Sequence, residues 1–400
     1  MDYLISITVF TVIFILVLLD RKNIKREGIV FIRRSYSLIE KITEFSTKNS
    51  KFINLIGLIA IVVGFAVMIF SVYFLFSLIF VKTEVPALQI VLPSLPGVCE
   101  TNLILCVPPV YWITSIFIIA FSHEIMHALL AASNRIKIKS IGYAFFLFLP
   151  AFFVEPDEKG LKKAKVINKL KIFAAGSFGN FLTVIIILVF FYLVYLTFSS
   201  FYKPYGIEVE VVPNSSAEKA NLKGIIIEVE NKTATIKNLI STLKEKNDGD
   251  YIFLKTTEGE YKIKLENKKI GIVIKREIYT SENTILNNTF IKDFFEYSKN
   301  FSFCFFESGI YCNYVYNSFF AWLVILSLGI GIFNLLPIKP LDGGLMLEEI
   351  LKIFFPKNYS KLSNLISLFL FIVIIFLLFK PYLWAFLFYL FLKIVALLFS

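Results

Sequence analysis

Charged residues are scarce in this 400-residue chain. Only 18% of the residues are Asp, Glu, Lys or Arg, whereas 57% are hydrophobic and 45 are Phe. Soluble domains carry roughly a quarter of charged residues. The composition therefore argues against an ordinary soluble protein and indicates a membrane protein.

Long apolar runs supply the expected membrane spans, since a transmembrane helix needs about 20 apolar residues. Seven runs approach that length: 2–20, 53–81, 109–132, 172–199, 317–336, 363–379 and 382–399. No A-x-A cleavage site follows the first run, and its positive flank comes after it, so we expect a retained anchor and no signal peptide. The expected fold class is a mostly α membrane protein with about seven transmembrane helices.

Basic residues gather in particular connectors and predict the topology. Connectors 21–51 and 133–171 each hold nine Lys or Arg against three acids, whereas the loop 82–108 has Lys82 as its only basic residue. The positive-inside rule places both basic connectors in the cytoplasm and the 82–108 loop and the 200–316 block outside. Because the membrane topology accounts for the net charge of +11, we expect no nucleic-acid partner.

Cysteines are few, and all four fall in the two predicted outer loops. They are Cys99, Cys106, Cys304 and Cys312. Disulfides are plausible on that side of the membrane, with the pairing open.

Residues 205–276 change character, because aromatic runs give way to short segments of alternating hydrophobicity. The pattern predicts a small extracytoplasmic α+β domain in the order strand, short helix, strand, helix, strands, with a capping serine opening a helix over Ser216–Ala220. The string Val212–Lys223 resembles the "SPAEKAGL" stretch of PDZ domains, although Gly224-Ile225 replaces their usual Gly-Asp. That resemblance implies peptide capture by strand addition, or a gate over the membrane site. The alternative is a plain β-rich spacer.

Histidine is rarer still, and the two copies, His123 and His127, lie together inside the third run. Residues four apart share one face of a helix, so both imidazoles can bind one metal ion, and Glu124 can reach a water molecule beside it. The pattern predicts a zinc site. The alternative is a polar helix contact or a proton path.

A third metal ligand cannot be histidine, so a carboxylate or thiolate must complete the set. The histidines lie about 21–27 Å below the outer surface at 1.5 Å per residue, which leaves the cysteines on the wrong side. The remaining candidates are Glu155, Asp157, Asp342, Glu348 and Glu349. Asp342 is favoured because it follows a span that also enters from outside, and because prolines and glycines around it let the chain end a helix and turn back at that depth.

The two motifs together resemble the site-2 proteases, which are zinc metalloproteases that cleave within membranes. The first motif is His123–His127, of the form HExxH, and the second is Asn334–Gly343, of the form N-x-x-P-x-x-P-L-D-G. The likeness spans roughly 109–345. It implies that His123, His127 and Asp342 bind zinc and that Glu124 is the general base.

Two asparagines acquire roles from the same resemblance. Asn334 would contact the substrate backbone, unless it merely caps the end of a helix. Asn180, in the segment Gly176–Asn180, would contact substrate or an oxyanion, although Ser177 stands where many members carry proline. The alternative for that segment is close helix packing through its small residues.

The apolar stretch 141–154 is too short to span a membrane and should dip in and return. Similar segments in the family form a re-entrant hairpin whose strand edge pairs with an unwound substrate. The alternative is an amphipathic anchor on the cytoplasmic face.

The expected function is an intramembrane zinc endopeptidase that cuts the transmembrane segments of single-span proteins near their cytoplasmic end. An upstream protease that trims the substrate is an expected partner, and the expected location is a prokaryotic plasma membrane. The alternatives are a metal-ion transporter or sensor, and another HExxH protease whose third ligand is Glu348 or Glu349. The expected segments are N-terminal helices and outer loop (1–108), first catalytic part (109–200), PDZ-like domain (201–280), outer loop (281–316), second catalytic part (317–345) and C-terminal helices (346–400).

Overall fold

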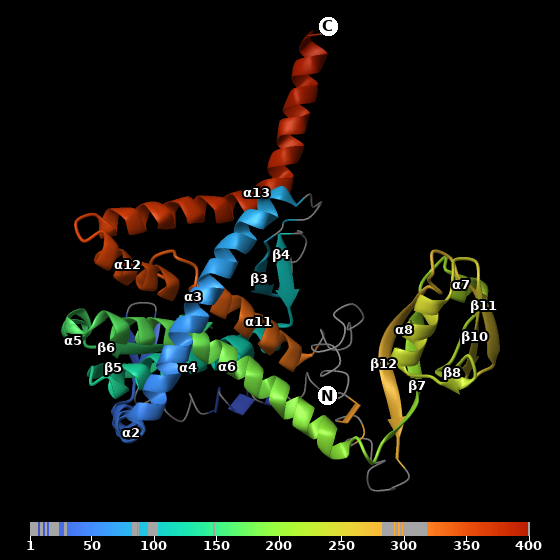
Figure 1. The fold of residues 1–400 in the computed structure, drawn as a ribbon, viewed down its shortest axis with the longest axis horizontal. Helices are drawn as coiled ribbons and strands as arrows, with labels where there is room; N and C mark the ends of the chain where they lie inside the picture. The colour runs from blue at the N-terminus through green and yellow to red at the C-terminus, as the bar shows by residue number, and fades with distance from the viewer. Residues whose placement is uncertain are drawn as a thin grey trace. The chain divides into compact units, whose positions relative to one another are not determined.

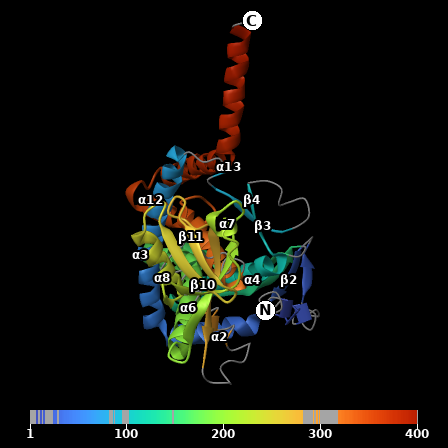
Figure 2. The same ribbon diagram turned by 90° about the vertical axis from the view of Figure 1, so that its right-hand side faces the viewer.

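The computed structural model describes most of the chain and groups it into two compact units, residues 1–184 with 322–400, and residues 185–321. The described residues are 7–8, 11–12, 14–15, 24–27, 30–81, 86, 88–94, 103–146, 149–281, 292, 295–296, 298 and 318–398. Most of the first predicted span lies outside the described residues, as do Cys99, Cys304 and Cys312. Figures 1 and 2 show the ribbon in two orthogonal views.

Four described helices are long and apolar enough to cross a membrane. They are α3 (Ser50–Phe80), α4 (Pro109–Ser133), α6 (Val166–Phe198) and the first part of α13 (Tyr359–Leu398). A shorter apolar helix, α11 (Phe319–Asn334), lies within the predicted run 317–336. The predicted runs from the second to the fifth are therefore helices, with boundaries within a few residues of those expected.

The closing pair of spans was predicted as two helices, and here the structure differs. Residues 359–398 form one continuous helix, α13, with Pro381 inside it. Figure 1 shows α13 sharply bent between two straight segments. Proline bends an apolar helix without always ending it, because neighbouring groups can satisfy the freed carbonyl. The total of seven spans stays a prediction.

A four-stranded sheet contains the predicted hairpin, in the order β1-β2-β5-β6. The hairpin strands β5 (Ile138–Phe146) and β6 (Leu149–Pro156) pair antiparallel across 141–154 as expected. Strands β1 (Lys25–Glu27) and β2 (Val30–Arg34) come from connector 21–51 and were not anticipated. Since β2 pairs with β5, two connectors predicted on the same side of the membrane share one sheet.

Smaller elements complete the first unit, residues 1–184 with 322–400. They are α2 (Tyr36–Lys48), the parallel pair β3 (Ile90–Pro93) and β4 (Ile104–Val107), α5 (Glu158–Lys163) and α12 (Asp342–Phe354). Cys106 in β4 is disulfide-bonded, and its partner lies outside the described residues. The structure thus contains a disulfide at a cysteine of the 82–108 loop, as the sequence suggested.

The second unit contains a small α+β domain whose sheet has the order β11-β10-β8-β7-β12, with β9 paired to β8. Its elements are β7 (Lys203–Val211), α7 (Ser216–Lys219), β8 (Ile226–Val229), β9 (Lys232–Thr233), α8 (Ile236–Glu245), β10 (Tyr251–Thr256), β11 (Glu260–Lys264) and β12 (Ile272–Thr280). The predicted order of strands and helices is confirmed, but the serine that caps α7 is Ser215, one residue earlier than expected. Leu239 of α8 is buried in one core with residues of the sheet.

Candidate metal centre

Helix α4 carries both histidines and Glu124 within about one helical turn. The Nε2 atoms of His123 and His127 lie 3.1 Å apart. The helical spacing of four residues places the two rings one above the other on the same face, as the sequence predicted.

Asp342 lies near the two imidazoles although it comes from the second sequence segment of the same unit, residues 322–400. It is the first residue of α12, after the turn 335–341 that follows α11. Added Cβ atoms at Gly343 and Gly344 would come within 2.1 Å of Leu335 O and 2.5 Å of Lys339 N. Only glycine fits at these two positions, because the turn packs directly against the start of α12.

The three side chains converge on one small volume. Asp342 Oδ2 lies 3.3 Å from His123 Nε2, and Asp342 Oδ1 lies 3.5 Å from His127 Nε2. Ligand atoms at zinc distances and tetrahedral angles are about 3.3–3.6 Å apart. The donor set of two imidazoles and one carboxylate, with its mutual distances of 3.1–3.5 Å, therefore fits a single zinc ion with a fourth position open.

His127 is oriented by the backbone of α6. Its Nδ1 lies 2.7 Å from the carbonyl oxygen of Ile172. Since a carbonyl only accepts, Nδ1 carries the proton and donates it, which leaves the Nε2 lone pair free for a metal. This contact could not be predicted from the sequence, because any residue provides a backbone carbonyl.

Gly176 of α6 faces both imidazoles. A Cβ added there would lie 2.3 Å from His127 Nε2 and 2.5 Å from His123 Nε2. The absence of a side chain at this position therefore makes room for the metal.

Replacing Gly176 with alanine should weaken zinc binding about 100-fold or more, because the methyl group would displace both ligand nitrogens. The gain of about 1 kcal/mol in helix propensity should be offset by overpacking against the two rings, which costs about 1–3 kcal/mol, so the melting temperature should stay similar or fall. Zinc content after dialysis against a graded chelator, read beside the melting temperature, measures both effects. Gly329→Ala in α11, where an added Cβ meets nothing within 4 Å, is the matched control. Unchanged zinc affinity in a folded Gly176→Ala protein would contradict the assignment.

Glu124 lies beside the centre and faces the hairpin. Its Oε2 accepts a hydrogen bond of 3.1 Å from the backbone N–H of Val154 in β6. This contact, which the sequence also did not indicate, fixes the carboxylate next to the ligands and next to the edge strand.

A cavity of about 380 Å³ opens on the centre. Its polar lining comes from His123, Glu124, Asn334 and Asp342, and its apolar lining comes from α4, α11 and the turn 335–341. Asn334 therefore lies where a substrate backbone could reach it. Asn180 is fully buried and does not line this cavity, and its Oδ1 accepts a hydrogen bond of 3.3 Å from Ser122 Oγ. Substrate contacts by either asparagine stay predictions.

The other acidic candidates have different partners. Glu348 pairs with Lys339, and Glu349 pairs with Lys169 and Lys352 at 3.2 and 2.6 Å. Glu155 accepts from Ser140, and Asp157 caps α5 through Gly160 N. Among the described residues, the one His, Cys, Asp and Glu group that could hold a metal is His123, His127 and Asp342.

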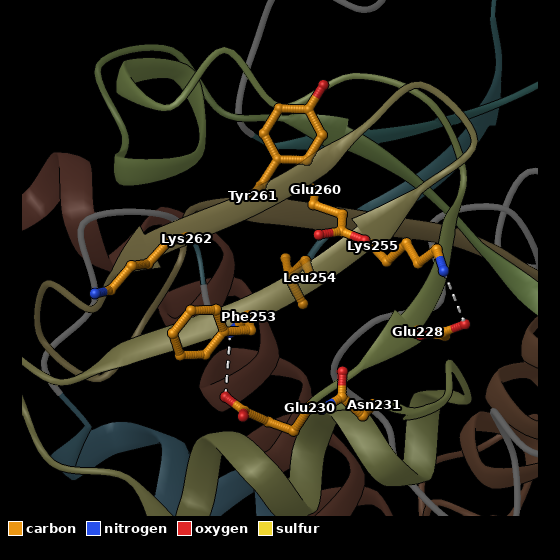
Figure 3. A pocket seen from close by; sticks show the side chains of 9 residues that line it. All are labelled: Glu228, Glu230, Asn231, Phe253, Leu254, Lys255, Glu260, Tyr261 and Lys262. Carbon is orange, nitrogen blue, oxygen red and sulfur yellow. Dashed lines mark hydrogen bonds and ion pairs between the residues drawn. The ribbon is translucent and has the colours of Figure 1, made fainter.

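A second hollow, of about 570 Å³, lies on the sheet of the α+β domain (Figure 3). Its lining is internally paired: Glu228 bonds Lys255 at 3.5 Å, Glu230 accepts from Phe253 N at 3.1 Å, and Lys262 lies 5.4 Å from the Phe253 ring centroid. Such cross-strand pairs stabilise a solvent-facing sheet and form no catalytic grouping.

Comparison with family models identifies the class to which this site belongs. The model of peptidase family M50 matches residues 111–378, about two-thirds of the chain. The chain therefore belongs to peptidase family M50, the site-2 protease family, whose members are metallopeptidases and generally depend on zinc. Comparison with curated proteins gave no match. With its four membrane-capable helices, the protein is an integral membrane metallopeptidase of this family.

Proposed function

We propose that this protein is an intramembrane zinc endopeptidase that hydrolyses peptide bonds within the transmembrane segments of single-span proteins, as in regulated intramembrane proteolysis. The convergence of His123, His127 and Asp342 beside Glu124 on an apolar-walled cavity carries the proposal.

His123, His127 and Asp342 would hold the zinc ion. When bound, zinc would supply Lewis acidity that polarises a peptide carbonyl and eases the ionisation of water. Glu124, held by the Val154 N–H, is placed to take the proton from the attacking water and to deliver it to the leaving amine. Asn334, on the cavity wall, would hold the substrate backbone.

A transmembrane substrate must be unwound before it is cut, because a helix engages its carbonyls in internal hydrogen bonds. Strand β6 is the edge of its sheet and touches Glu124 through Val154. The opposite flank of the hairpin is covered, because β2 pairs along β5. The β6 edge therefore offers backbone groups to an extended substrate next to the general base.

Reconstitution with a panel of single-span substrates tests the proposal. The purified protein in lipid vesicles should cut at least one substrate within its apolar segment, lose that activity when zinc is chelated, and regain it when zinc is returned. Mass spectrometry of the products locates the cut. Cleavage confined to soluble loops, or activity that survives metal removal in full, would refute it.

The PDZ-like domain is proposed as an outer filter that admits substrates already trimmed by another protease. An apolar groove of about 680 Å³ between α8 and β12, lined by Leu239, Leu243, Ile270 and Ile272 among others, could take a peptide. Three lysines at the groove, Lys244, Lys268 and Lys269, suit an acidic or carboxylate-ended segment. We propose that this domain lies outside a prokaryotic plasma membrane and that the metal centre lies toward the cytoplasm.

Deleting residues 205–276 should relax selectivity without abolishing cleavage. Pro204 and Tyr279 are partners in the β7–β12 ladder, so a short Gly-Ser linker can join the ends. We expect substrates with long outer portions to be cut at about the rate of trimmed ones, whereas the intact protein should prefer the trimmed form about 10-fold or more. Paired cleavage rates for the two substrate lengths measure the effect. Complete inactivity of a folded deletion protein would count against the filter.

A further inference from the structure

Few hydrogen bonds orient the carboxylate of Asp342. Its Oδ2 has no hydrogen-bond partner among the described residues. Metal ligands are usually oriented by hydrogen bonds from neighbouring groups. The position of this ligand therefore depends on the backbone turn 335–341 that leads to it.

That turn is held between two helices that lie outside the sequence motifs. Leu336 and Ile338 are buried in one cluster with Leu75 of α3 and with Leu370, Val373 and Leu377 of α13. The apolar residues of the turn are thus anchored on both sides, and the flanking helices take part in the geometry of the centre.

One polar contact defines the position of the turn more sharply than this packing can. The backbone N–H of Lys339 donates a 3.0 Å hydrogen bond to Ser367 Oγ of α13. The Ser367 hydroxyl donates in turn to the carbonyl of Ser363 at 2.8 Å, so its lone pair is directed at the amide. On its other side, the Lys339 amide lies against Gly344, where an added Cβ would come within 2.5 Å. The Lys339 peptide is therefore fixed between α12 and α13, three residues before the metal ligand.

The Lys339 side chain ties the same elements together. Its ammonium lies 3.3 Å from Asn364 Oδ1 of α13 and 2.5 Å from Glu348 Oε2 of α12. Ser367 and Asn364 are one turn apart on α13, so both contacts hold the turn on one face of that helix.

Helix α13 is itself fastened to α3 near the end of its first part, which covers Tyr359–Tyr382. The buried ammonium of Lys380 donates to the carbonyls of Leu78 and Ile79 at 2.8 Å, and also to Val81 O. These carbonyls belong to the C-terminal end of α3, where no intrahelical donor remains. α13 is consequently a fixed support against which the turn can be aligned.

We propose that Ser367 is a positioning residue for the metal centre and that the first part of α13 acts as a clamp on the turn that carries Asp342. This inference rests on the proposed zinc site and assigns a role to a helix beyond the motif-bearing region. Loss of the Ser367 hydroxyl would leave the half-buried Lys339 amide without this acceptor and let the turn, and with it Asp342, shift away from the imidazoles.

The test measures zinc affinity and the visible absorption spectrum of the Co²⁺-substituted full-length protein for Ser367→Ala, with two companion variants. Ser363→Ala is the matched control, because Ser363 is also buried on α13 but its Oγ has no partner among the described residues. Ser367→Thr is the conservative rescue, because threonine keeps the hydroxyl and its bond to the preceding turn.

We expect Ser367→Ala to weaken zinc binding about 10-fold and to change the Co²⁺ spectrum. Ser363→Ala and Ser367→Thr should match the original protein in both. If Ser367→Ala does not fold, Ser367→Cys, which keeps the size but accepts hydrogen bonds poorly, takes its place with the same expectation. Unchanged affinity and spectrum in Ser367→Ala, or equal losses in Ser363→Ala, would overturn the clamp. Failure of the original protein to bind zinc would refute the proposed function first and the clamp with it.

Discussion

Replacing Glu124 with glutamine should stop proteolysis while leaving zinc in place. Glutamine has the size of glutamate and can still accept the Val154 N–H through its amide oxygen, so the fold around β6 should persist. It cannot take a proton from water at neutral pH. Since general base catalysis contributes about 10²–10⁴-fold, we expect the cleavage rate to fall about 1,000-fold. Product formation per hour and zinc per protein molecule are the two measurements.

The same variant separates a peptidase from a transporter that uses the same polar groups. A transit site needs the ligands but not a base, so a transporter should keep most of its metal flux in Glu124→Gln. Glu158→Gln is the control, because Glu158 is an exposed residue of α5 whose ion pair within the described part of the chain is with Lys162 at 3.3 Å. Zinc lost from Glu124→Gln, or cleavage retained near the original rate, would contradict the role assigned to Glu124.

The local part of the site could be read from the sequence because its spacing follows from helix geometry. His123 and His127 share a face of any helix. A turn is predicted by Pro337, Pro340 and the two glycines that follow Asp342. Depth in the membrane then reduced the candidates for the third ligand to five acids, and the span and turn before Asp342 favoured that residue. The structure places Asp342 within 3.5 Å of both imidazoles.

Contacts between distant segments had no such local signal. Nothing in connector 21–51 indicated that β2 would pair with β5, because basic residues read there as topology signals. The Ile172 carbonyl, the Val154 amide and the open space at Gly176 are backbone features, which packing decides. The place of α13 was missed for a related reason: an apolar run predicts that a helix forms, while a single serine within it reveals its neighbour only after folding.

Replacing Asp342 with alanine should empty the metal site and leave the fold nearly intact. Asp342 is the first residue of α12, but it provides no side-chain cap, and its Oδ2 has no hydrogen-bond partner among the described residues. The loss in stability should therefore stay near the 0.3–1 kcal/mol that an acid at a helix N-terminus contributes. Zinc content should fall from about one ion per molecule to near zero, and cleavage should cease, because two imidazoles alone hold zinc weakly.

Glu349→Gln should give the opposite pattern and so decides between the possible third ligands. Its carboxylate is buried and pairs with Lys169 of α6, so its neutralisation leaves a nearly buried ammonium without that partner. Breaking such a pair costs about 3 kcal/mol or more, and the melting temperature should drop while zinc stays bound. Glu348→Gln should likewise retain zinc. Zinc titrations and thermal unfolding of the three variants in detergent make the comparison. Loss of zinc from Glu348→Gln or Glu349→Gln, with retention in Asp342→Ala, would favour a metalloprotease of another type.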